Sequence, residues 1–406
     1  MMGRLAILSL IRRPLRYGLL LLLTAAACAL PVFVTQLSGG LYEGLNRAAA
    51  PFPILAGAKG SPYQLVLNTV FLKDRPIGNV PYSEVTVLRN SGKADLVLPL
   101  AFGDSYRGFR ICGTEKEIFS YVVPGDKKPW LVPAQGKAFT GHGQAVIGAE
   151  TAKLTGLKLG DKFTSNHGFV EKGHKHNHPY MVVGILQPVN GPYDSSILIP
   201  IEDVWEAHHN PAKGKMPEQH EAHHEAEKGD VTAILVHPIG YGQAMQLLSQ
   251  WQRRSSGPTQ LIFPAQSLIA LYAMAGQSKS FWLILSGGLV AAAVLMTLLA
   301  LYWDGTSRME EWAILQALGA EPVAVRKLLL LEQFLLLLTG SVLGWLAGWG
   351  GSALAFWGLH QQTAVHLSLM PLWQGAVAPV LLVLIGTLGG ALPLWLLRKK
   401  DVAAYL

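Results

Sequence analysis

Long apolar runs dominate the pattern of this chain. Four of them, at about 17–37, 281–303, 328–349 and 375–397, each match the length of about 20 residues that a helix needs to cross a bilayer. Small residues recur in the last three runs, which suits close contact between helices in lipid. The pattern predicts four transmembrane helices, a long segment (38–280) between the first two and a loop (350–374) between the last two.

Basic residues predict the orientation of these helices. Those near the span ends gather in the segments 1–16, 304–327 and 398–406. Because cytoplasmic segments carry an excess of Lys and Arg, all three are predicted to be cytoplasmic, which places 38–280 and 350–374 outside. A cleavable signal peptide, or a lipoprotein signal at Cys28, is an alternative for the N-terminus; the apolar run continues past Cys28 and favours an uncleaved anchor.

The segment 38–280 has the pattern of a mixed α/β domain. Helices are predicted at 149–160, ending at Gly160, at 242–254, and at 264–277, where the helix leads into the second span as a stalk. Short apolar runs between turn residues predict strands at 64–72, 84–89, 94–102, 144–148, 181–189, 195–201 and 231–238. The predicted fold class is an α-helical membrane protein with a large mixed α/β extracytoplasmic domain.

Composition agrees with this class. Of the 406 residues, 50% are hydrophobic and 15% charged, which is too apolar for an ordinary soluble protein of this length. The formal net charge is +7, but the basic residues lie beside the apolar runs. Their positions indicate membrane topology and argue against a nucleic-acid partner.

Five segments, in this order, resemble the MacB/FtsX/LolC-type (type VII) permeases of ABC transporters. They are LAILSLIRRPLRYGLLLLL, GKAFTGHGQAVIGAETAKLTGLKLGDKF, MVVGILQPVNGPYDSSILIPIEDVW, RMEEWAILQALGAEPVAVRKLLLLE and ALPLWLLRKKDVAAYL. The resemblance implies a non-catalytic, four-span permease subunit of the bacterial inner membrane, with both termini in the cytoplasm and mechanotransmission to its periplasmic domain as its mode of action.

The same resemblance implies the partners. ATP is bound by a separate ATPase dimer, because the chain has no G-x-x-x-x-G-K-[ST] loop of its own. With four spans, the chain pairs with a second copy or a sister permease in the lipid bilayer. A periplasmic binding or adaptor protein is a further partner, and lipoprotein release or activation of an external protein is an alternative to export.

The segment 304–327 is predicted to hold the coupling helix that contacts the ATPase. On a helix, Ile314, Leu315 and Leu318 share one stripe, and Trp312 lies nearly one turn before Leu315. An interfacial helix lying among lipid headgroups is the alternative. The predicted contact residues are Arg308, Glu310, Glu311, Trp312, Ile314, Leu315, Leu318 and Gly319.

Histidines gather in the segment 167–224, where nine of the 13 in the chain lie. Imidazole is a common ligand of zinc and also suits copper and nickel. The pattern predicts divalent-metal binding, zinc first; a solvated low-complexity loop and a proton sensor are the alternatives. The candidate ligands are His167, His174, His176, His178, His208, His209, His220, His223 and His224.

One short string within this segment, HEAHH at 220–224, formally satisfies the H-E-x-x-H signature of zinc proteases. That chemistry needs His220 and His224 on one face of a rigid helix, with Glu221 activating a metal-bound water. The flanking residues offer no apolar face to hold such a helix against a core. A membrane zinc protease is therefore a remote alternative.

Overall fold

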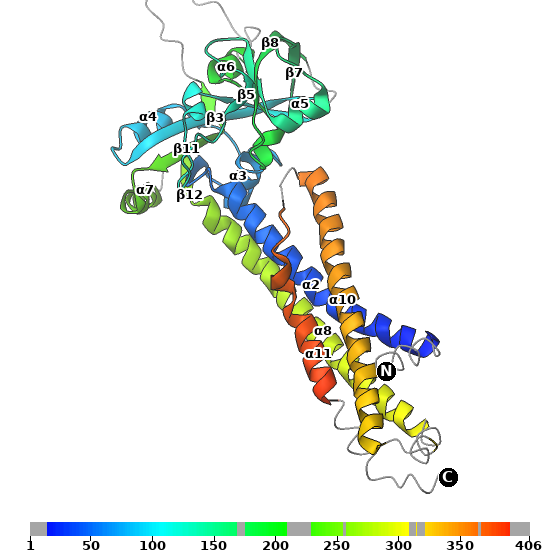
Figure 1. Ribbon diagram of the computed structural model, residues 1–406. Coiled ribbons are helices and arrows are strands. Elements are labelled where there is room, and N and C mark those ends of the chain that lie inside the picture. Colours follow the sequence, from blue (N-terminus) through cyan, green and yellow to red (C-terminus); the bar gives the residue numbers. More distant parts are fainter. Residues whose placement is uncertain are drawn as a thin grey trace, which may run out of the picture. The chain divides into compact units, whose positions relative to one another are not determined.

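The structure is a computed structural model that describes residues 14–168, 175–208, 229–254, 257–307, 314, 321–363 and 367–389 (Figure 1). The chain divides into two compact units. The first, the helical unit, comprises Met1–Tyr42, Ala273–Gly358 and Leu367–Leu406, and the second, the α/β unit, comprises Glu43–Tyr272 and Leu359–His366.

Four helices carry the apolar runs: α2 (Pro14–Ala49), α8 (Pro264–Ser307), α10 (Pro322–Thr363) and α11 (Val377–Gly389). Three stretches within them, Tyr17–Ala49, Leu283–Ala300 and Lys327–Leu359, are long and apolar enough to cross a membrane. The described part of α11 is apolar but shorter, and the predicted fourth span continues into residues outside the described ranges. The count of four spans therefore stays a prediction.

Helix α8 agrees with its prediction, whereas α10 extends further than predicted. The stretch 264–277 and the second span form one continuous helix, α8, as predicted. In contrast, α10 continues to Thr363, so the first part of the predicted loop 350–374 is helical. That part contains no proline that would interrupt the helix.

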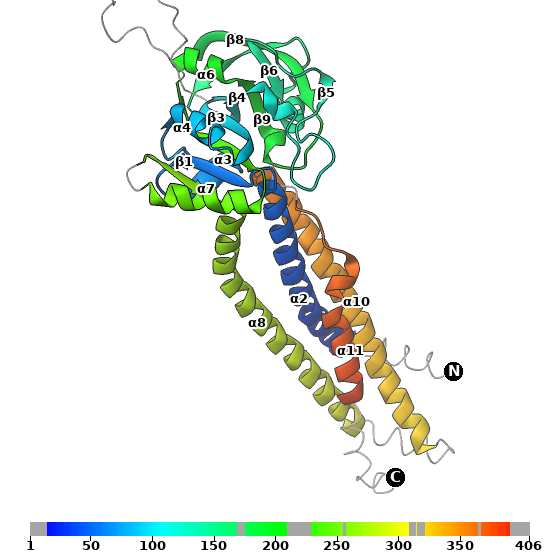
Figure 2. The ribbon, with the colours of Figure 1, turned by 90° about the vertical axis from the view of Figure 1, so that its left-hand side faces the viewer.

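Glycines allow α2 and α10 to pack closely. Gly340, Gly344 and Gly348 lie four residues apart on α10 and therefore on one face. A Cβ at Gly344 would lie 2.2 Å from the Ala25 carbonyl oxygen, and one at Gly348 would lie 2.5 Å from that of Ala29. Figures 1 and 2 show α2, α10 and α11 running alongside one another. The recurrence of small residues in the sequence thus corresponds to a real helix contact.

The buried Gln36 ties α2 to the segment that follows α10. The side-chain oxygen of Gln36 accepts from the Met370 amide at 2.9 Å, and its Nε2 donates to the Met370 carbonyl at 3.4 Å. The same amide thus satisfies both backbone groups of Met370, which suits a polar side chain that is fully buried.

The α/β unit is built on a 10-stranded mixed sheet with the order β12-β1-β11-β3-β4-β9-β6-β8-β5, in which β7 pairs with β3 and β8. The pairs β4–β9 and β6–β8 are parallel, and the others are antiparallel. Figure 2 shows β1 toward one end of this sheet and β5 toward the other. The strands are β1 (Ile54–Ala58), β2 (Val80–Pro81), β3 (Ala94–Tyr106), β4 (Phe109–Thr114), β5 (Pro133–Gly136), β6 (Gln144–Ile147), β7 (Lys162–His167), β8 (Lys175–Leu186), β9 (Ser196–Pro200), β10 (Asp230–Val231), β11 (Ala233–Pro238) and β12 (Thr259–Ile262).

Short helices cover the sheet, and the core lies between them and the strands. Fully buried aliphatic side chains of the strands, such as Ile111, Ile147, Ile197 and Ile234, form this core together with Leu247 of α7. The helices are α3 (Pro62–Thr69), α4 (Ser83–Arg89), α5 (Ala149–Thr155), α6 (Ile201–His208) and α7 (Tyr241–Arg253), with the 3-10 turns η1 (Lys116–Phe119), η2 (Pro192–Ser195) and, in the helical unit, η3 (Leu372–Gly375).

Two of the predicted strands are wrong, because 64–72 and 84–89 lie in helices α3 and α4. Helix α3 begins where the Ser61 hydroxyl accepts from the Gln64 amide and Pro62 occupies the first turn, both typical helix starts. In α4, the buried Val85 and Leu88 are three residues apart, a helical spacing.

The predicted end of one helix is also wrong. Helix α5 ends at Thr155, because Gly156 adopts a left-handed φ of 75°, whereas Gly160 belongs to the turn before β7. The strands predicted at 94–102, 144–148, 181–189, 195–201 and 231–238 and the helix at 242–254 are confirmed by β3, β6, β8, β9, β10 with β11, and α7.

Candidate metal centre

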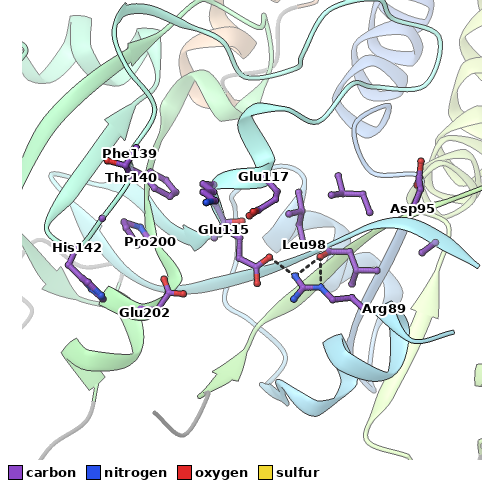
Figure 3. A pocket seen from close by; sticks show the side chains of 16 residues that line it. Arg89, Asp95, Leu98, Glu115, Glu117, Phe139, Thr140, His142, Pro200 and Glu202 are labelled. Carbon is purple, nitrogen blue, oxygen red and sulfur yellow. Dashed lines mark hydrogen bonds and ion pairs between the residues drawn. The ribbon is translucent and has the colours of Figure 1, made fainter. Parts of the chain in front are cut away.

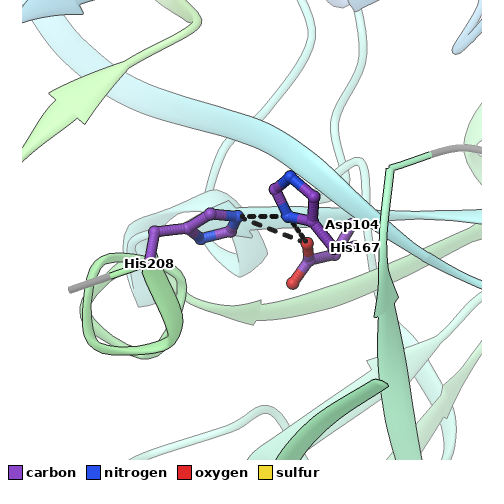
Figure 4. Close-up of side chains that lie close together, drawn as sticks. All are labelled: Asp104, His167 and His208. Atoms are coloured by element: carbon purple, nitrogen blue, oxygen red, sulfur yellow. Dashed lines mark hydrogen bonds and ion pairs between the residues drawn. The ribbon is translucent and has the colours of Figure 1, made fainter. Parts of the chain in front are cut away.

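Three elements of the α/β unit bring Asp104, His167 and His208 together (Figure 4). Asp104 lies in β3, His167 is the last residue of β7, and His208 is the last residue of α6. Asp104 and His167 are direct partners in the antiparallel pairing of β3 with β7. Two further hydrogen bonds hold this pairing: the Gly168 amide donates to the Gly103 carbonyl at 2.9 Å, and the Ser105 hydroxyl donates to the Gly168 carbonyl at 2.7 Å.

The three side chains meet through one atom each. The distances are 3.2 Å between His208 Nε2 and His167 Nδ1, 3.4 Å between His208 Nε2 and Asp104 Oδ1, and 3.6 Å between His167 Nδ1 and Asp104 Oδ1. Asp104 is buried, with 2% of its side chain exposed, whereas the His167 side chain is 57% exposed. The cluster thus has a buried carboxylate at its base and an imidazole at the surface.

Neighbouring groups orient the cluster. His208 Nδ1 lies 2.7 Å from the Val204 carbonyl oxygen in the preceding turn of α6. Because a carbonyl only accepts, Nδ1 carries the proton, and Nε2 is the atom that faces Asp104 and His167. The Ser165 hydroxyl donates to Asp104 Oδ2 at 3.3 Å. The hydrogen bond to Asp104 raises the pKa of His208, although burial opposes this shift.

A second group of potential ligands, His142, Asp203 and Glu206, involves the same helix α6. His142 Nδ1 lies 2.5 Å from Asp203 Oδ1, and the Gly143 amide donates to Asp203 Oδ2 at 2.8 Å. The hydrogen bond to Asp203 raises the pKa of His142. These residues line a cavity of ≈ 250 Å³, to which His178 and Tyr180 also contribute.

A larger pocket of ≈ 760 Å³ lies over β3 and β4 (Figure 3). Its Arg89 is engaged within the protein: it forms an ion pair with Glu115 and donates to the Val97 carbonyl at 2.9 Å. Asp95, Glu117 and Glu202 also line this pocket, so its lining has more carboxylates than cations. Arg89 is therefore not free to bind an anionic ligand in this pocket.

Comparison with known proteins identifies the helical unit. Residues 283–402 match the model of the family described as FtsX-like permease C-terminal. This part of the chain is therefore similar to the C-terminal region of FtsX-like permeases. Its resemblance to the MacB/FtsX-type ABC permeases is therefore confirmed. The match and the apolar helices together indicate a membrane protein whose mixed α/β unit lies between its first two apolar helices.

Two solved structures are similar to this chain at low sequence identity. The periplasmic region of MacB from Actinobacillus actinomycetemcomitans is 13% identical, with a TM-score of 0.36, covering 56% of this chain and 95% of that one. The extracellular domain of the noncanonic ABC-type transporter YknZ from Gram-positive bacteria is 12% identical, with a TM-score of 0.32, covering 52% and 98%. No curated protein matches the sequence.

Only part of the predicted set of metal ligands lies in the described residues. His167 and His208 come together, and His178 lies at the cavity of the second group. The backbone of His176 belongs to β8. The remaining predicted ligands lie outside the described residues: His174, His209, His220, His223 and His224.

The predicted coupling residues are described only at Ile314, which is helical with 57% of its surface exposed. The others lie outside the described residues: Arg308, Glu310, Glu311, Trp312, Leu315, Leu318 and Gly319.

Sequence reasoning missed Asp104, His142, Asp203 and Glu206. For Asp104 a signal existed, because a carboxylate in the run LVLPLAFGDSY interrupts a strand that is otherwise apolar. A carboxylate at such a position needs charged or hydrogen-bonding partners. The other three residues come from surface turns and from α6, where no pattern in the sequence distinguishes them.

Proposed function

We propose that this chain is the transmembrane subunit of an ABC transporter and passes the ATP-driven motion of a separate ATPase to its α/β unit outside the cytoplasm. The observation that carries this proposal is the match of residues 283–402 to the FtsX-like permease C-terminal region. The sequence supports a separate ATPase because it holds no phosphate-binding loop of the G-x-x-x-x-G-K-[ST] type. The chain itself then has no catalytic role.

The lengths of the helices support mechanical transmission. Helix α2 has 36 residues and α8 has 44, which at 1.5 Å per residue gives about 54 Å and about 66 Å. Both exceed the bilayer core of about 30 Å. Each helix therefore has enough length to cross the membrane and continue as a lever, and each has residues in both the helical unit and the α/β unit.

The proposed contact with the ATPase is the segment between α8 and α10. The sequence predicts an apolar stripe there, formed by Trp312, Ile314, Leu315 and Leu318 on a helix, and Ile314, the one of these that the structure describes, is exposed. A short helix with an exposed apolar stripe suits docking into a groove of a partner protein. Arg308, Glu310 and Glu311 then supply the charged rim of this contact.

The proposed location is the bacterial inner membrane, with both termini in the cytoplasm and the α/β unit in the periplasm. Exposed apolar side chains on α11, such as Leu381, Leu384, Ile385 and Leu388, support contact with lipid or with a second permease subunit. We expect two such subunits, identical or related, to assemble with an ATPase dimer.

We expect the activity of this transporter to be linked to a divalent metal, either in export or in homeostasis of the cell envelope. The observation that supports this link is the convergence of Asp104, His167 and His208 in the α/β unit. Lipoprotein release and mechanical activation of a periplasmic protein use the same levers, but no contact among the described residues favours either.

Co-purification with the cognate ABC ATPase tests the proposal. We expect the ATPase to remain bound to the chain in lipid nanodiscs, and its ATP turnover to change several-fold when the chain is present. An ATPase whose phosphate-loop lysine is replaced by alanine serves as the control that binds without turnover. If no ABC ATPase of the source bacterium binds the chain, the proposed function is wrong.

A further inference from the structure

We propose that Asp104, His167 and His208 form a zinc site with three protein ligands and one position open to solvent. This proposal specifies the metal link of the proposed function and rests on it for its biological role. The geometry itself involves only the α/β unit. The ligand atoms are Asp104 Oδ1, His167 Nδ1 and His208 Nε2.

The distances between these atoms fit one tetrahedral ion. Zinc binds imidazole nitrogen at about 2.0–2.1 Å and carboxylate oxygen at about 2.0–2.2 Å. In a tetrahedron with such bonds, the ligand atoms are separated by about 3.3–3.6 Å. The three observed separations, 3.2 Å, 3.4 Å and 3.6 Å, lie within about 0.1 Å of this range. An ion therefore fits with only small movements of the side chains.

The ligands are already oriented for such an ion. The bond of His208 Nδ1 to the Val204 carbonyl leaves Nε2 unprotonated in the neutral ring, which is the form that binds a metal. The Ser165 hydroxyl holds the second carboxylate oxygen of Asp104. Such outer hydrogen bonds are a regular feature of metal sites because they fix the ligand geometry. The pairing of Asp104 with His167 in the sheet fixes the third ligand.

The donor atoms fit zinc and disfavour calcium, magnesium and Cu(I). Two imidazole nitrogens and one carboxylate oxygen are a donor set of zinc sites that keep an open position. Calcium and magnesium prefer six or more oxygen ligands, and Cu(I) prefers sulfur. The burial of Asp104 puts a negative charge at the base of the site, which favours a divalent cation over a neutral ligand. The exposed His167 leaves the fourth position accessible to water or to a ligand group of a cargo.

The same contacts also fit a hydrogen-bonded His–His–Asp cluster in which a proton takes the place of the metal. Such a cluster has no preference for a divalent ion, so metal titration separates the two. Two of the proposed ligands, His167 and His208, precede histidine-rich stretches of the sequence, and stretches of this composition can bind metal by themselves. The experiment therefore removes that background first.

The test uses the full-length chain in detergent, with Co²⁺ as a spectroscopic probe and Zn²⁺ as its competitor. In a background variant, the seven other predicted ligands are replaced by Asn: His174, His176, His178, His209, His220, His223 and His224. We expect this variant to keep one tight site with the intense visible absorption of four-coordinate Co²⁺. Zn²⁺ should displace the Co²⁺ and bleach this absorption.

Two single substitutions in this background then test the ligands. Asp104→Asn and His208→Asn should each weaken Co²⁺ and Zn²⁺ binding at least about 10-fold, because each removes a direct ligand. Asp95→Asn is the matched control: Asp95 lies on the same sheet, and its Oδ1 is 2.5 Å from His237 Nδ1. We expect this control to leave both affinities unchanged.

If the background variant binds no Co²⁺ tightly, or if Asp104→Asn and His208→Asn bind as the background does, the site is wrong. Circular dichroism of each variant shows whether it is folded, and His167→Asn provides a second ligand variant should Asp104→Asn fail to fold. Because the measurement contains no ATPase, its failure leaves the proposed function intact. Loss of ATPase binding, in turn, leaves the metal result intact.

Discussion

Asp104 shows how much a single buried charge constrains this protein. Moving an unpaired carboxylate out of water costs several kcal/mol, so a buried Asp requires hydrogen bonds, cations or a metal. Here the Ser165 hydroxyl and the imidazoles of His167 and His208 surround it. The sequence revealed the two histidines through their clustering, whereas the carboxylate between them depends on the pairing of β3 with β7, which no local pattern specifies.

The contact of His142 with Asp203 predicts a pH-dependent contribution to stability. The hydrogen bond to Asp203 raises the pKa of His142 above its ordinary value of about 6.5. A raised pKa means that the folded state holds the proton more tightly, so the stabilisation is complete below about pH 6.5. It is lost as the pH rises through the folded-state pKa.

We therefore expect His142→Asn to lower the melting temperature of the chain more at about pH 5.5 than at about pH 8.5. The measurement is a thermal melt of wild type and variant at both pH values, with a chelator present so that bound metal does not contribute. An equal effect of the substitution at the two pH values would show that the ion pair with Asp203 does not stabilise the fold.

At the scale of elements, the sequence predicted most strands correctly but mistook two helices for strands. The buried strands predicted at 94–102 and 195–201 appear as β3 and β9. The apolar runs 64–72 and 84–89 do not separate a strand from a buried helix by periodicity alone. The Ser61 cap and Pro62 favour helix α3, and the three-residue spacing of the buried Val85 and Leu88 fits helix α4. Helix α10 continues past the predicted end of its span. The apolar run marks the part of the helix that crosses the membrane core, and the helix itself extends beyond that run.

The close contact of the α10 glycines with α2 predicts that one added methyl group lowers the stability of the chain. A Cβ at Gly344 would lie 2.2 Å from the Ala25 carbonyl oxygen and 2.8 Å from the Cβ of Cys28. Gly344→Ala should therefore push α2 and α10 apart and destabilise the chain by about 1–3 kcal/mol.

Gly350→Ala is the matched control on the same helix, because nothing lies within 4 Å of the added Cβ. Alanine favours helix over glycine, so this substitution should be neutral or slightly stabilising. Thermal melting in detergent, followed by tryptophan fluorescence, measures both variants. Equal melting temperatures for the two alanine variants would contradict the close packing of α2 on α10.

At the scale of the whole molecule, the class of the protein could be predicted from the sequence, because many weak signals that occur in a fixed order along the chain point to it. The apolar spans, the basic flanks and the permease-like segments agree with one another along the chain, and the family match covers residues 283–402. The order of strands in the sheet could not be predicted from the sequence. The pairings of β4 with β9 and of β1 with β11 join residues far apart in the sequence, and several strand orders bury the same apolar faces.

The account depends on force that enters the chain through the segment between α8 and α10. The proposed levers α2 and α8 and the proposed metal site can serve an ABC transporter only if an ATPase binds there. A charge in the apolar stripe of this segment should abolish that binding, because burying an unpaired carboxylate in the contact is costly.

The most direct measurement is the affinity of the cognate ABC ATPase for nanodiscs that carry wild-type chain, Leu315→Asp or Leu154→Asp. Leu154 is an exposed leucine of α5 and provides the same substitution at a site remote in sequence. We predict that Leu315→Asp lowers the affinity at least about 10-fold, equivalent to about 1.4 kcal/mol, and that Leu154→Asp leaves it unchanged. An ATPase that binds the Leu315→Asp chain as tightly as the wild type would contradict the account.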